Sequence, residues 1–242
     1  MVLNANAAHA GPEMDMEKYG SWLEERDEAG KTIKKSCFVT ISREYGCDGY
    51  PLANNLRELL NNRQKSAWLV FSHPIMEKMI EDENLGAPLI LSISEQRYSF
   101  VNWFIDGIVP DYLQSPQSKA FERMKTLILN LAGKGNCIIL GGGASIITRE
   151  IDSSKFCGVH IRLISSHENR VKRIMKRFRL DRGEAEKQVE KKQYARAKFV
   201  ESFTGRTAAD PTLYHLIINN DLNGPDTMSE TIFSYMKLKG MI

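Results

Sequence analysis

The sequence predicts an α/β domain built on a parallel β-sheet with helices on both of its faces. Short β-rich runs alternate along the chain with helical patterns, and this order is typical of parallel strands joined by helical crossovers. The strand runs are continuously apolar, as in "NCIIL" at 136–140, and such strands are buried on both faces. The length of 242 residues suits one such domain, or one domain with an added segment.

Each predicted element follows from its local pattern. Apolar runs predict strands over 37–41, 67–71, 136–140, 157–163 and 213–219. Helical patterns predict helices over about 51–61, 74–82, 94–109, 119–135, 167–178 and 225–239. Pro51 suits the first turn of its helix, and the amphipathic pattern of 119–135 stops at a glycine.

The first 35 residues or so are predicted to be an extension outside the core. They are polar and broken by several glycines, which favours a flexible segment or a short helix around Trp22 and Leu23. The remaining residues, 36–242, would form the main domain.

Charge is unevenly distributed along the chain. The net charge is only +3, too small to indicate nucleic-acid binding by itself. From Ser166 to Arg206, however, thirteen Lys and Arg residues stand against six Asp and Glu residues, a net charge of +7. This local excess indicates either an anionic ligand, with phosphate favoured, or a solvated helical face.

Cysteine usage and hydropathy narrow the class of protein. The four cysteines show no C-x-x-C spacing and have no nearby histidines, so neither a zinc site nor a disulfide framework is predicted, and no residue is assigned as a metal ligand. The N-terminal sequence lacks a signal-peptide pattern, and no apolar run reaches the length of a membrane helix. A cytoplasmic protein without a membrane partner is expected.

The segment "CFVTISREYGCDGYPL" at 37–52 has the layout of a phosphate-binding loop. It passes from a strand through Gly46 and Gly49 into a helix, whose free N–H groups would face an anion beyond the strand end. Against the pattern G-x-x-x-x-G-K-[ST], Arg43 replaces the first glycine and Gly49 the lysine. An ordinary turn between strand and helix would give the same two glycines.

Several segments resemble the cytidylate-kinase-like family, which is related to bacterial cytidylate kinase. "VTISREYGCDGYPLANNL" is similar to the family's opening I-T-I-S-R-E-Y-G-S-G-G-R-E-I-A, and "CIILGGGASII" to V-I-V-G-R-G-A-x-x-I. Residues 170–206, which include "FTGR", follow the family's basic helix and lid helix, and "DPTLYHLIINND" resembles D-P-x-x-Y-D-L-x-I-N-T. The resemblance covers roughly residues 37 to 238.

The resemblance implies a three-layer P-loop NTPase fold of the adenylate-kinase-like type. Such a fold has a five-stranded parallel sheet, a helical insertion that binds a nucleoside monophosphate, here 72–115, and a lid, here 180–210. The implied activity is transfer of a phosphoryl group from ATP, with Mg2+, to CMP or another small acceptor. The partners would be these small molecules rather than nucleic acid, and a homodimer is left open.

The resemblance also suggests roles for individual residues. Arg43, Arg196 and Arg206 would supply catalytic charge; Lys192 shares a helix face with Arg196, since they lie four residues apart. Nucleotide phosphates would contact Lys192 and the loop residues Tyr45, Gly46, Cys47, Asp48, Gly49 and Tyr50. Acceptor binding is assigned to Ser72, Gly141, Gly142 and Gly143. The alternatives are a surface ion pair between Arg43 and Glu44, and a solvated lid.

Other basic and acidic residues have weaker assignments. Arg170, Arg173 and Arg177 share one helix face, and Arg173 is expected to point inward unless the whole face is solvated. Asp210 and Pro211 fit a structural turn better than a role in orienting the lid.

Three neutral residues stand where charge is expected in the family: Tyr50, Ser72 and Gly142. Loss of one electrostatic contributor can slow a reaction by about 100-fold or more. A catalytically weak or inactive nucleotide-binding pseudokinase is therefore the alternative to a kinase. A structural domain that binds a partner through the Trp22–Leu23 extension is a third interpretation.

Overall fold

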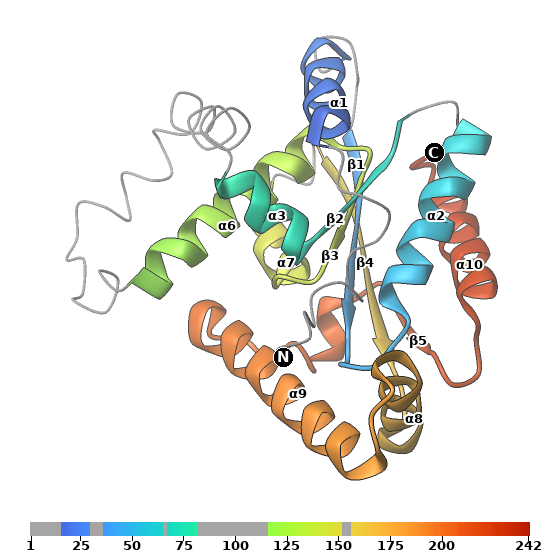
Figure 1. Ribbon diagram of the computed structural model, residues 1–242. Helices are drawn as coiled ribbons and strands as arrows, with labels where there is room; N and C mark the ends of the chain where they lie inside the picture. The colour runs from blue at the N-terminus through green and yellow to red at the C-terminus, as the bar shows by residue number, and fades with distance from the viewer. Residues whose placement is uncertain (1–15, 30–35, 65–66, 82–115, 152–155) are drawn as a thin grey trace.

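A parallel five-stranded sheet runs through the centre of this computed structural model (Figure 1). The structure describes residues 16–29, 36–64, 67–81, 116–151 and 156–242. The strands are β1 (Ser36–Arg43), β2 (Leu69–Ser72), β3 (Cys137–Leu140), β4 (Phe156–Ile164) and β5 (Leu216–Asn219). Their order across the sheet is β2-β3-β1-β4-β5, and all neighbours pair in parallel. The predicted α/β fold class is thereby confirmed.

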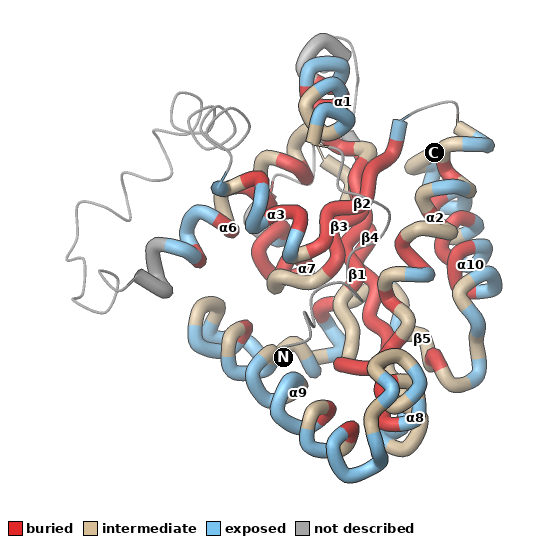
Figure 2. Tube along the Cα trace, viewed as in Figure 1, coloured by how far each residue is buried: buried red, intermediate tan, exposed pale blue. Residues whose placement is uncertain are grey.

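Helices cover both faces of the sheet (Figures 1 and 2). One face packs against α2 (Gly49–Gln64) and α10 (Pro225–Leu238), and the other against α1 (Met16–Ala29), α3 (His73–Glu81), α6 (Pro116–Lys134) and α7 (Ala144–Ile147). Successive strand residues alternate between the two cores: Phe38 belongs to the core with α6, and Val39 to the core with α2. This alternation buries both faces and explains the continuously apolar strands.

The carboxyl end of the central strand β1 opens toward two further helices. Both α8 (His167–Phe178) and α9 (Arg182–Thr204) lie beyond the ends of the strands (Figure 1). Asp181 caps α9 by accepting the Glu184 backbone N–H, while the Glu184 side chain accepts the Asp181 N–H. Because this capping box fixes the start of α9 directly after α8, the basic segment of the chain is held over the sheet edge.

The observed element bounds differ from the predicted ones in a few places. The helix after β1 begins at Gly49, two residues before Pro51. The last strand is shorter than predicted because Pro211–Leu213 forms a short 3-10 helix, capped by the Asp210 carboxylate. This agrees with the structural role expected for Asp210. The predicted helix at 94–109 lies outside the described residues, as does the predicted insertion beyond residue 81.

The N-terminal helix α1 corrects the expectation that this segment lies outside the core. Trp22 and Leu23 are buried against the sheet in the same cluster as Phe71. The Trp22 indole N–H donates to the Ala67 carbonyl at 2.8 Å, and the Arg26 guanidinium donates to the Lys134 carbonyl. The prediction failed because one tryptophan and one leucine in a polar segment give little periodic signal, although together they fill a site on the sheet.

We expect Trp22→Ala to lower the free energy of unfolding by about 3–5 kcal/mol, since the change leaves a cavity and removes the bond to Ala67. Urea denaturation followed by circular dichroism measures the difference. The control is Leu238→Ala at a residue that is 87% exposed, for which a change within about 0.5 kcal/mol is expected. Equal effects of the two substitutions would contradict the placement of α1 in the core.

Candidate functional site

A pocket of about 600 Å³ lies at the carboxyl edge of the sheet. Its walls come from the end of β1 and the loop after it, the junction of β2 with α3, the turn from β3 to α7, and the inner side of α9. The volume lies in the range of pockets that bind small molecules. The position also agrees with the rule that open parallel sheets bind ligands beyond the carboxyl ends of their strands.

The charged side chains that line this pocket are all cationic. They are Arg43, Arg162, Arg177, Lys192 and Arg196. Among the described residues no Asp or Glu lines it. A pocket with this lining favours an anionic ligand, and guanidinium groups suit phosphate in particular.

Two of the five cations already have partners within the chain. The Arg162 guanidinium donates to the Ala208 carbonyl and lies 4.0 Å from the Glu44 carboxylate. Arg177 donates to the Asp48 carboxylate at 3.3 Å. These contacts hold the two guanidinium groups at the pocket wall and offset part of their charge.

The other three cations have no hydrogen bond or carboxylate partner in the part of the chain that the structure describes. Arg196 lies over the Tyr45 ring at 4.9 Å, a cation–π contact, and Lys192 lies one turn earlier on α9. Burial, with the charge of Arg196 as the next cause, lowers the pKa of Arg43 to about 9. Burial likewise lowers the pKa of Arg196. Arg43 therefore remains charged at neutral pH, and an anion beside it and Arg196 would relieve the repulsion between the two groups.

Arg43 does not form the surface ion pair with Glu44 that was one of its expected alternatives. The Glu44 carboxylate instead accepts the Ser165 N–H at 2.9 Å and lies 3.8 Å from Arg170 Nε. Glu44 thus points away from the pocket, toward the start of α8, while Arg43 lines the pocket.

The loop after β1 retains fewer free backbone donors than the sequence suggests. The N–H groups of Tyr45, Cys47 and Asp48 already donate within the chain, to Gln193 Oε1, the Glu44 carbonyl and Asn220 Oδ1. The N–H groups of Gly46, Gly49 and Tyr50 have no partner among the described residues. Three of the six loop residues expected to contact phosphates therefore keep an unpartnered N–H, and two of these three, Gly46 and Tyr50, line the pocket.

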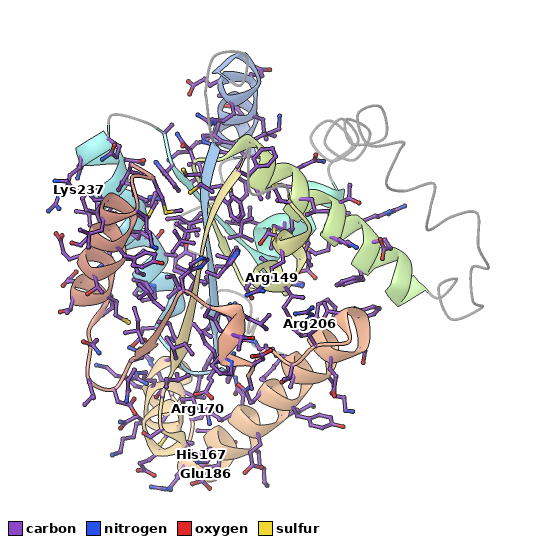
Figure 3. All side chains as sticks on the ribbon, turned by 180° about the vertical axis from the view of Figure 1, so that it is seen from behind. Arg149, His167, Arg170, Glu186, Arg206 and Lys237 are labelled. Atoms are coloured by element: carbon purple, nitrogen blue, oxygen red, sulfur yellow. The ribbon has the colours of Figure 1, made fainter. Side chains whose placement is uncertain are left out.

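Gly46 allows the loop to pack closely on α8. Its φ is +99°, and a Cβ there would lie 2.8 Å from Arg170 Cβ. Both observations exclude a larger residue without a shift of the backbone. Arg170, which lies on α8 (Figure 3), contacts this loop and does not line the pocket.

The predicted acceptor residues come together on the opposite wall. Gly141, Gly142 and Gly143 all have positive φ values and form the turn into α7. Ser72 is buried beside them, and all four residues line the pocket. Whether they bind an acceptor stays a prediction.

The remaining predicted residues divide into two groups. Tyr50, Lys192 and Arg196 line the pocket. Asp48 does not line it and pairs instead with Arg173 and Arg177. Arg206 is exposed just after the C-terminal end of α9 (Figure 3) and does not line the pocket.

Sequence reasoning missed the placement of two cations. Arg177 was assigned to a helix face where Arg173 was expected to point inward, yet Arg177 lines the pocket and Arg173 is bound by Asp48 and Asp221. Arg162 was not considered, although a charged residue near the carboxyl end of an apolar strand is a usable signal.

The described pocket lining does not form a magnesium site by itself. Protein-bound Mg²⁺ is usually held by one or two carboxylates together with substrate phosphates. The pocket offers hydroxyl groups, among them those of Thr40 and Ser42, but no described carboxylate. No cluster of three or more His, Cys, Asp or Glu side chains suited to a metal occurs among the described residues.

Helix α9 is tied to the loop after β1 by specific contacts. Tyr45 packs with Ala185 and Val189, its hydroxyl accepts from Gln188 Nε2 at 2.7 Å, and its N–H donates to Gln193. These contacts set the rotation of α9, so that Lys192 and Arg196 face the pocket.

A parallel sheet that ends in a glycine-containing loop, closed by a basic helix over a cationic pocket, defines the class of P-loop kinase-like proteins. The sequence model of the cytidylate kinase-like family matches residues 38–222. The chain belongs to this family.

Among solved structures, an uncharacterized protein from Eubacterium ventriosum ATCC 27560 is similar, with a TM-score of 0.62 and 18% identity over 84% of this chain and 99% of that chain. The shikimate kinase from Acinetobacter baumannii in complex with shikimate has a TM-score of 0.43 and 10% identity over 88% and 99% of the two chains. The shikimate kinase from Bacteroides thetaiotaomicron also has a TM-score of 0.43, with 14% identity over 84% and 98%. No curated protein matches the sequence significantly. None of the described helices is long and apolar enough to cross a membrane.

We expect Asp48→Asn to strengthen binding of pyrophosphate by about fivefold, or about 1 kcal/mol, because one carboxylate that holds Arg177 is removed. Calorimetric titration with pyrophosphate measures the change. Glu186→Gln, at the start of α9 and far along the helix from Arg206 (Figure 3), removes one negative charge away from the pocket and is the control. Unchanged or weaker binding by Asp48→Asn would show that Asp48 does not compete with the ligand.

Proposed function

We propose that the protein is a phosphotransferase of the cytidylate-kinase-like type. It would transfer the γ-phosphoryl group of ATP to a nucleoside monophosphate such as CMP, or to another small acceptor. The observation that carries this proposal is the group of three cations, Arg43, Lys192 and Arg196, which face one pocket without a carboxylate partner among the described residues.

Phosphoryl transfer depends mainly on positioning and on neutralising charge. The triphosphate would lie between the loop after β1 and α9, where the N–H groups of Gly46 and Tyr50 have no partner among the described residues. Arg43 would approach it from the sheet and Arg196 from α9. Because these groups are held by packing before the ligand arrives, little reorganisation is needed.

The acceptor would occupy the end of the pocket near the β3–α7 turn. Ser72 supplies a hydroxyl there, and Gly141, Gly142 and Gly143 allow close approach to the backbone. Closure by α9 would exclude water, which otherwise competes with the acceptor for the phosphoryl group.

A pseudokinase is the second candidate, and one observation favours it. No described Asp or Glu lines the pocket, so the described residues offer no carboxylate base for an acceptor hydroxyl and no carboxylate ligand for a metal. Such a protein would bind ATP without turning it over.

We expect Arg196→Ala to weaken ATP binding at least about tenfold, because a charged hydrogen bond contributes about 1.5–3 kcal/mol. Isothermal calorimetry measures the affinity. Arg182→Ala is the control, since Arg182 lies exposed on the same helix and pairs with Glu168 and Glu186. Equal affinity of the wild type and Arg196→Ala for ATP would contradict a contact between Arg196 and the nucleotide.

Arg206→Ala tests the remaining predicted lid cation. Arg206 is exposed and outside the pocket lining, so a smaller loss than that of Arg196→Ala is expected. An equal loss would mean that the lid closes further around bound ATP.

Removal of magnesium is expected to weaken ATP binding by less than about tenfold. The described pocket lining offers cations but no carboxylate, so the metal would be held chiefly by the phosphates of the nucleotide. Titrations of ATP in magnesium chloride and in EDTA make the comparison. Binding that disappears in EDTA would show that the protein needs the metal to recognise the nucleotide.

Turnover separates the two candidate functions. Release of ADP is measured with CMP, other nucleoside monophosphates and small hydroxy compounds as acceptors, using the wild type and Arg196→Ala. Acceptor-dependent release that falls in the variant supports the kinase. ATP binding without release above that of the variant favours the pseudokinase.

A further inference from the structure

The loop after β1 lacks the lysine that a P-loop uses to contact phosphates. Gly49 stands at the lysine position, and Arg43 stands at the position of the first glycine of the pattern. Arg43 and Gly49 lie six residues apart in the sequence, and in the structure they are in contact.

The side chain of Arg43 passes directly over Gly49. A Cβ at Gly49 would lie 3.2 Å from Arg43 Cδ and 3.3 Å from Arg43 Cγ. Gly49 does not have a positive φ, so its backbone conformation does not require glycine. Its close neighbours supply the reason instead: a side chain at this position would crowd the stem of Arg43 and also Leu140, whose Cδ1 would lie 3.3 Å from the Cβ.

The guanidinium group of Arg43 lies against a second glycine, in the turn after β3. A Cβ at Gly141 would overlap Arg43 Nη1, and Gly141 has a φ of +89°. The N–H of Gly141 donates to the Ile41 carbonyl at 3.0 Å, which fixes this turn beside the end of β1. Gly49 and Gly141 therefore form a channel through which Arg43 reaches the pocket.

The Arg43 guanidinium that passes through this channel has no partner of opposite charge among the described residues. Arg43 lines the pocket and makes no hydrogen bond or ion pair with another described residue. Arg43 is half-buried, and a structural arginine in such a position would normally be paired, because an unpaired charge that has lost part of its water is costly. Its location beside Arg196 adds repulsion, which an anion in the pocket would relieve.

We propose that Arg43 performs the charge-neutralising role of the missing P-loop lysine, and that Gly49 and Gly141 are small because they form its channel. The ligand group is the polyphosphate of a nucleoside triphosphate. The inference rests on the proposed function for the identity of the nucleotide, but the polyphosphate contact can be tested separately. In this proposal the cation stands at the end of β1, at Arg43, rather than at the start of α2, where a P-loop has its lysine.

An exchange of residues tests the proposal. Binding of ATP and of inorganic tripolyphosphate is measured by calorimetry for the wild type, Arg43→Met, Gly49→Lys and the double variant Arg43→Gly/Gly49→Lys. Arg43→Met keeps an apolar stem without the charge, and we expect it to lose at least tenfold in affinity for both ligands. Gly49→Lys alone should also weaken binding, since its side chain crowds Arg43. The double variant should recover affinity to within about fivefold of the wild type, which is non-additive.

Two measurements keep a folding defect apart from a binding defect. Thermal unfolding is recorded for every variant, and Arg43→Lys, which keeps a charged side chain, should retain affinity to within about tenfold of the wild type. If Arg43→Lys binds as weakly as Arg43→Met at equal stability, position 43 contributes no charge to binding and the proposal is overturned.

The remaining outcomes distinguish this inference from the proposed function. Wild-type affinity in Arg43→Met, or an absence of recovery in a folded double variant, overturns the inference and leaves the phosphotransferase standing. Binding of tripolyphosphate but not ATP, lost in Arg43→Met, supports the inference and contradicts the proposed function. A wild-type protein that binds neither ligand overturns both.

Discussion

Five cations converge on one pocket, and the rest of the structure holds them there against their mutual repulsion. At separations of a few ångströms, like charges near a protein surface repel by several kcal/mol. Two acidic residues of the loop after β1 offset part of this cost. Glu44 lies near Arg162 and Arg170, and Asp48 binds Arg173 and Arg177. Both carboxylates stand outside the pocket lining, so they stabilise the cationic wall without filling the site.

The same network joins the segments that build the site. Arg173 donates to Ser165 Oγ, the Asn220 carbonyl and Asp221, and so connects α8 with the ends of β4 and β5. Hydrogen bonds from Ser165 and from the Ser166 N–H help to hold the pKa of Asp221 well below its usual range, so the carboxylate stays ionised. Tyr45 then joins the loop to α9. These contacts hold Lys192 and Arg196 of α9 at the pocket wall, and a site whose groups are already ordered loses less entropy when it binds an anion.

Aromatic packing holds the C-terminal end of α9. Phe199 and Phe203 of α9 pack against Phe121 of α6, and the Phe121 and Phe203 rings are stacked at 4.5 Å. Val200 packs with Ile146 of α7. Since α9 contacts the loop at one end and α6 and α7 at the other, it spans the pocket as a fixed bridge in this conformation. Opening of the site would have to break one of these two apolar contacts.

The sequence by itself determined the order of strands and helices, the parallel sheet and the family. Periodicity and the nearly continuous apolar runs indicated the elements and the sheet, because burial on both faces leaves a direct mark on residue type. The family was indicated separately, by the resemblance of motifs such as "VTISREYG". The sequence also placed Lys192 and Arg196 on one helix face, because helical spacing is local. Burial of α1 could not be predicted, since its contacts with the sheet join residues about 50 positions apart, as Tyr19 and Val70 do.

Only the tertiary structure decided which basic residues form the site. Arg173 and Arg177 lie four residues apart, yet one is bound by two carboxylates and the other lines the pocket. It also decided the role of Gly49. In the sequence this residue stands where a P-loop has its lysine, and in the structure the side chain of Arg43 packs against it. Side-chain identity records neither the partners of a charge nor the room around a glycine, because both depend on segments that folding brings together.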